Sequence, residues 1–184
     1  MFDPAATKPE FVSWLYNVQD RFKNSSKEEI KSELEKTHFN CAVACEHWLG
    51  DFNMSTVLRN ANGFNMKEVF YIGQRHWNRS GSVGTHHYTK LTHCKDFTSF
   101  YSLVKDEYTL IGIDNIPGSV SITDFKWPEN TLMIFGEEGC GLTEEAQKHC
   151  KHTVYIPMFG SVRSFNCGVS SGIALYDYIL KQER

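Results

Sequence analysis

Short apolar segments alternate with amphipathic segments along most of this chain. Apolar runs typical of buried strands lie at 41–45, 69–73, 109–114, 131–135 and 154–156. Segments with helical spacing lie between them, at 55–62, 96–105, 143–150 and 169–181. Strands that alternate with helices predict an α/β fold, with a mostly parallel sheet that carries helices on both faces.

Capping residues indicate where the predicted helices begin. Asp96 and Thr143 precede two of them, and Asn53 is a good cap for the helix that ends at Gly63. The segment before the first strand differs, because residues 8–37 have the spacing of two helices, the second of which begins near Ser26. The chain therefore starts with a helical segment and continues as an α/β unit.

The composition fits a single globular unit. The chain has 184 residues, of which 41% are hydrophobic and 22% are charged. No apolar run approaches the roughly 20 residues that cross a bilayer, and the first residues lack a signal-peptide pattern. The six cysteines are too sparse for a disulfide scaffold. We therefore expect a cytoplasmic protein without a membrane partner.

One stretch carries an unusual charge distribution, although the net charge is only −3. Residues 74–95 contain no acidic residue, and four histidines and two aromatic rings lie among their cations. Basic side chains attract phosphates, and aromatic rings stack on unpaired bases. This pattern favours RNA contact through Arg75, Arg79 and Lys90. The alternative is an ordinary solvated loop.

Two turns near the end of the chain carry the candidate chemistry. The segments 135–142 and 156–166 each follow an apolar run with glycine, proline and small polar residues. Neither turn matches the sequence of a phosphate-binding P-loop or GxGxxG, so a nucleoside triphosphate or dinucleotide site is not supported. No CxxC pair or HExxH segment is present, so we expect buried thiols and no metal site. A hydrolase GxSxG elbow is also absent.

Three motifs, taken in order, resemble the signature of a known family. They are Asn53 with Arg59, then Gly136-x-Glu138-x-x-Gly141-Leu142, then Ile156-Pro157-Met158 followed by Ser164-Phe165-Asn166. This set resembles the SpoU/TrmH family of RNA methyltransferases in the SPOUT superfamily, over roughly residues 39–182. The chain departs from the family at Ser55, Thr56, Phe165 and Cys167-Gly168, where small or apolar residues are exchanged.

The resemblance implies a fold and a domain division. Residues 39–184 would form a SPOUT methyltransferase domain whose C-terminal part is tied in a deep trefoil knot. Residues 1–38 would form a separate N-terminal helical extension. Family members usually dimerise through the knot region, and the predicted last helix is apolar on more than one side. We therefore expect a homodimer.

The resemblance also implies an activity and its residues. The chain would transfer a methyl group from S-adenosylmethionine to a ribose 2′-hydroxyl of tRNA, with rRNA as another candidate substrate. The implied cofactor-binding residues are Ile113, Asp114, Phe135, Gly136, Glu137, Gly139, Ile156, Pro157, Met158 and Ser164. The implied catalytic residues are Arg59, Asn53, Glu138, Ser164 and Asn166. The alternative function is RNA binding without catalysis.

Overall fold

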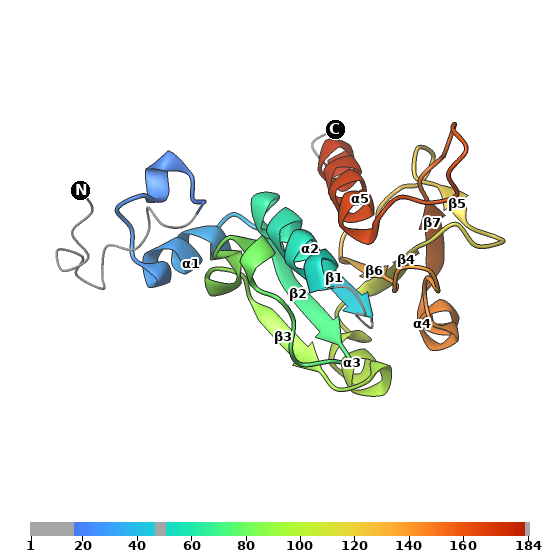
Figure 1. Cartoon of the computed structure of the whole chain (residues 1–184), viewed down its shortest axis with the longest axis horizontal. Helices are drawn as coiled ribbons and strands as arrows, with labels where there is room; N and C mark the ends of the chain where they lie inside the picture. The colour runs from blue at the N-terminus through green and yellow to red at the C-terminus, as the bar shows by residue number, and fades with distance from the viewer. Residues whose placement is uncertain (1–16, 47–50, 183–184) are drawn as a thin grey trace.

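The computed structural model describes residues 17–46 and 51–182. A seven-stranded sheet crosses the described part of the chain, and every strand pairing in it is parallel (Figure 1). The strands are β1 (Phe39–Glu46), β2 (Met66–Ile72), β3 (Leu91–Cys94), β4 (Thr109–Ile113), β5 (Val120–Ser121), β6 (Thr131–Phe135) and β7 (His152–Tyr155). Their order across the sheet is β3-β2-β1-β6-β4-β7-β5.

Helices cover both faces of this sheet, as the alternation of strands and helices predicts. They are α1 (Lys27–Glu35), α2 (Asp51–Gly63), α3 (Phe97–Val104), α4 (Glu144–His149) and α5 (Cys167–Gln182). Alternate residues of a strand point to opposite faces. Val43 of β1 accordingly packs in a core with α2 and α5, whereas Ala44 packs in a second core with α3 and α4. None of the described helices is long and apolar enough to span a membrane.

Several element boundaries differ from those predicted. β3 lies inside the stretch expected to be a loop. β5 lies in a segment for which no strand was predicted. Asn53 is not the cap of α2, because the helix already begins at Asp51 and Asn53 lies in its first turn. The last helix begins two residues earlier than predicted, directly after Asn166.

The extension contributes one well-defined helix, α1, which lies at one end of the molecule (Figure 1). Ser26 and Glu29 form the capping box that starts it. Of the other helix expected within 8–37, most residues lie outside the described part, and Asp20–Phe22 is a single 3₁₀ turn. Ile30 of α1 and Phe22 pack against Tyr88, so the extension docks on the domain through a small apolar cluster.

The connection from β2 to β3, residues 73–90, serves as the crossover between two parallel strands. It contains 3₁₀ turns at Ser80–Ser82 and Thr85–His87, and it packs along α2. The Ser55 hydroxyl of α2 donates a hydrogen bond to the Asn78 carbonyl of this crossover. The crossover therefore contacts the N-terminal half of α2 at Asn78 and reaches α1 at Tyr88.

Candidate active site

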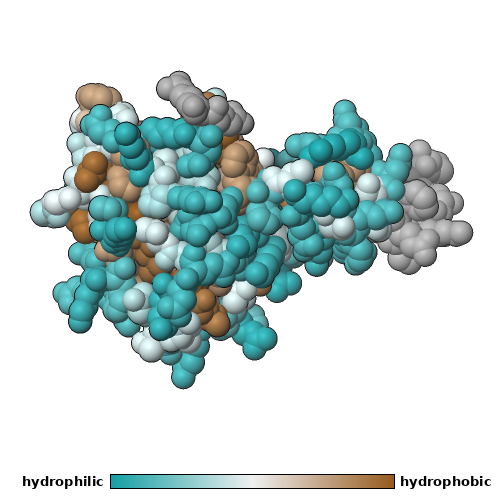
Figure 2. All heavy atoms as spheres, turned by 180° about the vertical axis from the view of Figure 1, so that it is seen from behind, coloured by the Kyte–Doolittle hydropathy of each residue, from teal (hydrophilic) through white to brown (hydrophobic). Residues whose placement is uncertain are grey.

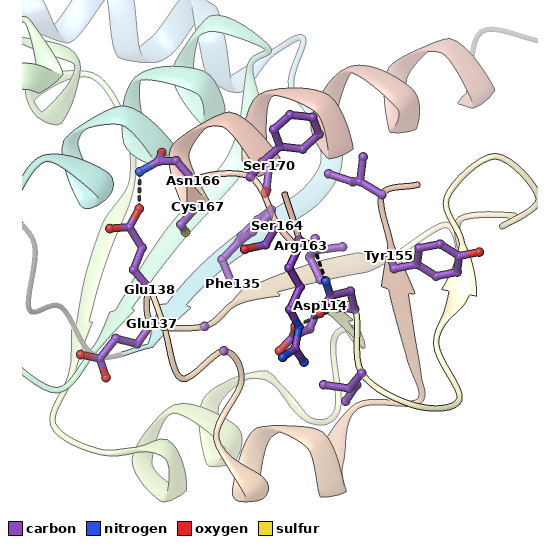
Figure 3. A pocket seen from close by; sticks show the side chains of 18 of the residues that line it. Asp114, Phe135, Glu137, Glu138, Tyr155, Arg163, Ser164, Asn166, Cys167 and Ser170 are labelled. Atoms are coloured by element: carbon purple, nitrogen blue, oxygen red, sulfur yellow. Dashed lines mark hydrogen bonds between the residues drawn. The ribbon is translucent and has the colours of Figure 1, made fainter. Parts of the chain in front are cut away.

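A cavity of about 480 Å³ lies at the carboxyl ends of β4, β6 and β7 (Figure 3). Ligands of parallel α/β sheets commonly bind at this edge. Nine of the ten predicted cofactor residues line the cavity, and Pro157 does not. Glu138, Ser164 and Asn166 of the predicted catalytic set also line it. Two of the three sequence motifs, those containing Gly136 and Ile156, therefore meet at one site.

The glycine turn after β6 closes on itself. The Glu137 amide donates to the Gly141 carbonyl at 3.1 Å, and the Gly141 amide donates to the Glu137 carbonyl at 2.8 Å. A Cβ on Gly136 would lie 2.1 Å from the Gly141 carbonyl carbon. Real side chains do not approach backbone this closely, so the turn requires glycine at position 136.

Two carboxylates, at the ends of the strands on either side of β6, hold the far side of this turn. Asp114, directly after β4, accepts from the Leu142 amide at 2.9 Å and from the Asn115 amide at 2.7 Å. Glu46, at the end of β1, is buried and accepts from the Thr143 amide at 3.1 Å and from its hydroxyl at 2.6 Å. Asp114 thus supports the cavity wall as well as lining it.

Asn166 connects one predicted catalytic residue from each of the other two motifs. Its Oδ1 accepts from the amides of Gly168 and Val169, which caps α5. This cap fixes the orientation of the side-chain amide, so Nδ2 is the atom that faces the other two motifs. Nδ2 donates to Asn53 Oδ1 at 2.7 Å and to Glu138 Oε1, the contact drawn in Figure 3.

An Asn166→Asp substitution tests whether these donated hydrogen bonds matter. Aspartate still caps α5 but cannot donate to Asn53 or Glu138, and its carboxylate faces the carboxylate of Glu138. Losing a hydrogen bond to a charged group costs about 1.5–3 kcal/mol, so we expect kcat for methyl transfer to fall about 10- to 100-fold. Circular dichroism should show unchanged helix content.

The pH dependence of kcat in the same variant distinguishes a positioning role of Asn166 from a simple loss of packing. A carboxyl group introduced beside the Glu138 carboxylate takes up a proton more readily than an isolated one as pH falls. Once protonated, the carboxyl group introduced by Asn166→Asp again donates to Glu138, and the deficit in kcat should shrink below about pH 5.5. An unchanged kcat at neutral pH, or a deficit that is constant with pH, would contradict this role for Asn166.

Arg59 and Asn53 are the two predicted catalytic residues that do not line the cavity. Asn53 still reaches the site through its hydrogen bond with Asn166. Within the described part of the chain, Arg59 makes no such contact with Asn166. It lies on α2 with its side chain exposed, whereas its neighbour Leu58 is buried in the core. The next residue, Asn60, donates from Nδ2 to the Gly168 carbonyl at 2.8 Å and to the Ser171 hydroxyl at 2.9 Å, which ties α2 to α5. Arg59 therefore lies on the helix that is tied to α5, and it does not line the cavity of its own chain.

The cavity includes residues that were not among the predicted site residues. These are Asn115, Ile116, Cys140, Gly141, Tyr155, Arg163, Phe165, Cys167 and Ser170. Arg163 adds a cation to the lining, and its carbonyl accepts from Asn115 Nδ2 at 2.6 Å. Its place directly before Ser164 is the signal that could have identified it. Tyr155 points away from the other labelled side chains in Figure 3.

Two buried thiols near the site are held neutral. Burial, followed by the nearby charge of Glu138, raises the pKa of Cys167 to about 12. Burial also raises the pKa of Cys45 well above its usual value. A thiol with so high a pKa is a poor nucleophile. Within residues 17–46 and 51–182, no group of His, Cys, Asp and Glu side chains is arranged to hold a metal ion.

The three predicted RNA-binding residues lie in two different places. Arg75 and Arg79 are exposed on the crossover, and the Arg79 guanidinium lies 5.8 Å from the centre of the Trp77 ring. Lys90 lies at the amino-terminal end of the strands, just before β3. Its ammonium is 2.9 Å from a carboxylate oxygen of buried Glu68. Lys90 therefore compensates a buried charge.

The fold and the cavity define an α/β protein with its ligand site at the carboxyl ends of parallel strands. The family model of the SpoU rRNA Methylase family matches residues 40–176, so this chain belongs to that family. The resemblance seen in the motifs is confirmed.

Curated relatives share segments of this chain. The 23S rRNA (guanosine-2′-O-)-methyltransferase RlmB of Neisseria meningitidis is 34% identical over 79 residues, which are 41% of this chain and 31% of the relative. The tRNA (guanosine(18)-2′-O)-methyltransferase TARBP1 of Mus musculus is 29% identical over 75 residues, which are 41% of this chain and 5% of the relative. The matched segments thus span a third or less of these longer proteins.

Solved structures confirm the fold. The A. aeolicus TrmH/SpoU tRNA modifying enzyme superposes with a TM-score of 0.75 at 19% identity, covering 85% of this chain and 82% of that one. The SpoU methyltransferase AviRb from Streptomyces viridochromogenes superposes with a TM-score of 0.73 at 20% identity, covering 83% of this chain and 63% of that one. AviRb has also been solved with the cofactor AdoMet.

Proposed function

We propose that this chain is an S-adenosylmethionine-dependent methyltransferase that acts on a ribose 2′-hydroxyl of RNA. The observation that carries the proposal is the meeting of three motifs at one site, where Asn166 joins Asn53 and Glu138 beside the cavity. Membership of the SpoU family and the activities in the names of the relatives support the same reaction.

The cavity fits this cofactor in size and in chemistry. A volume of about 480 Å³ lies within the range typical of small-molecule sites. The side chains of Ile113, Ile156 and Met158 offer apolar contact to a nucleobase, and the peptide groups of the glycine turn offer hydrogen bonds to its edge. Asp114 and Ser164 add polar groups. When bound, S-adenosylmethionine supplies an electrophilic methyl group on a sulfonium centre.

The residues of this chain then have to align the ribose hydroxyl and assist the loss of its proton. A guanidinium stays charged and binds phosphate with two parallel hydrogen bonds. We assign Arg59 to the RNA phosphate next to the target ribose and to the negative charge that develops on the 2′-oxygen. Asn53, Ser164 and Asn166 position the ribose or Arg59, and Glu138 orients the glycine turn.

We further propose that the chain works as a homodimer through α5. Large apolar side chains are exposed along this helix and the loop before it: Phe159, Val162, Phe165, Val169, Tyr176 and Leu180. Val169, Tyr176 and Leu180 follow helical spacing, which places them on one stripe. An apolar stripe of this size is typical of a subunit interface. The loops 136–142 and 156–166 would form the family's trefoil knot behind it.

For the substrate we propose tRNA. The supporting observation is that the A. aeolicus tRNA modifying enzyme superposes on this chain over most of both lengths. Arg75 and Arg79 of the crossover would contact its phosphates. We also propose that residues 1–38 are an N-terminal extension of a domain formed by residues 39–184. We expect the protein to act in the cytoplasm.

Methylation assays test this function directly. Calorimetry should show that S-adenosylmethionine binds, and label from methyl-tritiated S-adenosylmethionine should enter unmodified tRNA at a ribose. Nucleoside mass spectrometry then identifies the methylated 2′-position. Transfer to rRNA in place of tRNA would correct the substrate. RNA binding without any cofactor heat would instead favour a non-catalytic RNA-binding protein.

A further inference from the structure

The crossover carries a cluster of stacked rings and cations. The imidazoles of His86 and His87 lie 4.1 Å apart, and His86 meets the edge of Trp77 at 6.2 Å. Arg79 lies over the same Trp77 ring. The Ser82 hydroxyl donates to the Arg79 carbonyl at 2.7 Å and lies 2.8 Å from His86 Nδ1, which holds the cluster on its 3₁₀ turn.

The extension adds two lysines to this cluster. Ile30 and Phe22 pack on Tyr88, the residue that follows His87, so α1 is fixed against the crossover. Lys27 and Lys31 are one helical turn apart on α1, near the position of Ile30. The charges of Lys27 and Arg79 act on both imidazoles, and that of Lys31 acts on His87. Three permanent cations thus surround two histidines.

We propose that α1 and the crossover form one phosphate-binding surface, which holds the substrate RNA at a distance from the methylated ribose. This inference rests on the proposed function. The crossover runs from Arg75 at the active-site edge back to Tyr88 at α1, so the surface continues the path of the RNA away from the cavity. The extension stands out from the body and is largely hydrophilic on the face seen in Figure 2.

Two of the four acidic residues of α1 are engaged within the extension. Glu29 bonds the Ser26 amide in the capping box, and Glu33 pairs with Lys36 at 3.0 Å. Burial and the nearby cations lower the pKa of both His86 and His87, and no carboxylate within residues 17–46 and 51–182 is among the causes of either shift. Like charges gathered in this way repel one another, and a bound phosphate diester would relieve that repulsion.

Paired charge-neutralising variants test the surface. Lys27→Gln with Lys31→Gln should weaken the binding of fluorescein-labelled bulk tRNA about tenfold, and the slope of log affinity against log salt should fall by about 1.5, the value for two lost phosphate contacts. Lys23→Gln with Lys36→Gln is the matched control, because these lysines belong to the same extension but neither acts on the two imidazoles. The control should leave the slope unchanged.

The pH dependence of RNA binding provides a second test of the surface. The pKa of each histidine is lowered in the free protein, and a bound phosphate raises it, so binding takes up protons. RNA affinity, measured by fluorescence anisotropy, should therefore rise as pH falls from about 7.5 to 5.5, and His86→Gln with His87→Gln should flatten this rise.

Three outcomes decide the proposal. A reduced salt slope in the Lys27 and Lys31 variant alone supports it. Equal salt slopes in that variant and its control overturn the proposed surface. The proposed function is still supported in that case if Arg75→Ala with Arg79→Ala lowers the salt slope. A wild-type chain that binds no tRNA or rRNA overturns both.

Discussion

A Gly136→Ala variant should lose S-adenosylmethionine affinity by about 100-fold while the sheet stays folded. The new methyl group would lie 2.1–2.3 Å from backbone atoms of Gly141 and Leu142, which cannot move away as a flexible side chain could. Overpacking of this kind costs roughly 1–3 kcal/mol, and here it acts on the turn that lines the cavity. Isothermal titration calorimetry with S-adenosylmethionine measures the loss.

The matched control is Gly63→Ala, at the end of α2. A Cβ at this position would meet no atom within 4 Å. Both variants make the same chemical change, so a difference in cofactor affinity belongs to the turn. Thermal unfolding monitors whether the Gly136 variant keeps its core. Wild-type cofactor affinity in a folded Gly136→Ala protein would show that the cavity beside this turn is not the cofactor site.

Much of the sheet could be predicted because its strands are buried on both faces. The segments 109–114 and 131–135 have the continuous apolar runs that such strands need, and both are strands within a residue of the predicted bounds. β3 was missed because Leu91-Thr92-His93-Cys94 has only one aliphatic residue. It lies at the edge of the sheet, where backbone pairing with β2 suffices to hold it.

The local part of the site was predictable, and the contacts between distant residues were not. The glycine turn and the Ile156 segment stand out in sequence because a bound ligand and a tight turn both need small residues. The tie between Asn53 and Asn166 joins positions 113 residues apart, and no spacing rule gives it. No spacing rule gives the contact of Glu46 either. This charged residue directly follows the apolar run of β1, and its carboxylate accepts two hydrogen bonds from Thr143.

The place of Arg59 also depends on packing that the sequence does not reveal. Helical spacing puts Leu58 in the core, but only the tie from Asn60 to α5 shows where the neighbouring guanidinium emerges. The segment just after α2 also contacts the apolar stripe of α5, because the rings of Phe64 and Tyr176 lie 6.1 Å apart. In a dimer formed through this stripe, Arg59 would face the partner subunit.

Arg59→Ala should therefore lower methyl transfer by about 10²- to 10³-fold without changing cofactor affinity, because it removes a charge that stabilises the transition state. Arg59→Lys keeps the charge but loses the planar fork, and should retain only part of the activity. Single-turnover transfer from labelled S-adenosylmethionine measures both rates, and calorimetry checks the cofactor. A loss of cofactor affinity in Arg59→Ala would contradict a role of Arg59 that is limited to RNA and the transition state.

Mixed dimers of Arg59→Ala and Gly136→Ala chains decide which subunit Arg59 serves. Each variant alone should be nearly inactive. If Arg59 completes the cavity of the partner subunit, one site of a mixed dimer carries both defects and the other carries neither. Random mixing should then restore about a quarter of the wild-type activity per chain, since half of the dimers are mixed and each has one intact site. If Arg59 serves its own cavity, every site keeps one defect. Mixed dimers that form, as shown by two-tag purification, yet remain inactive would refute the shared site.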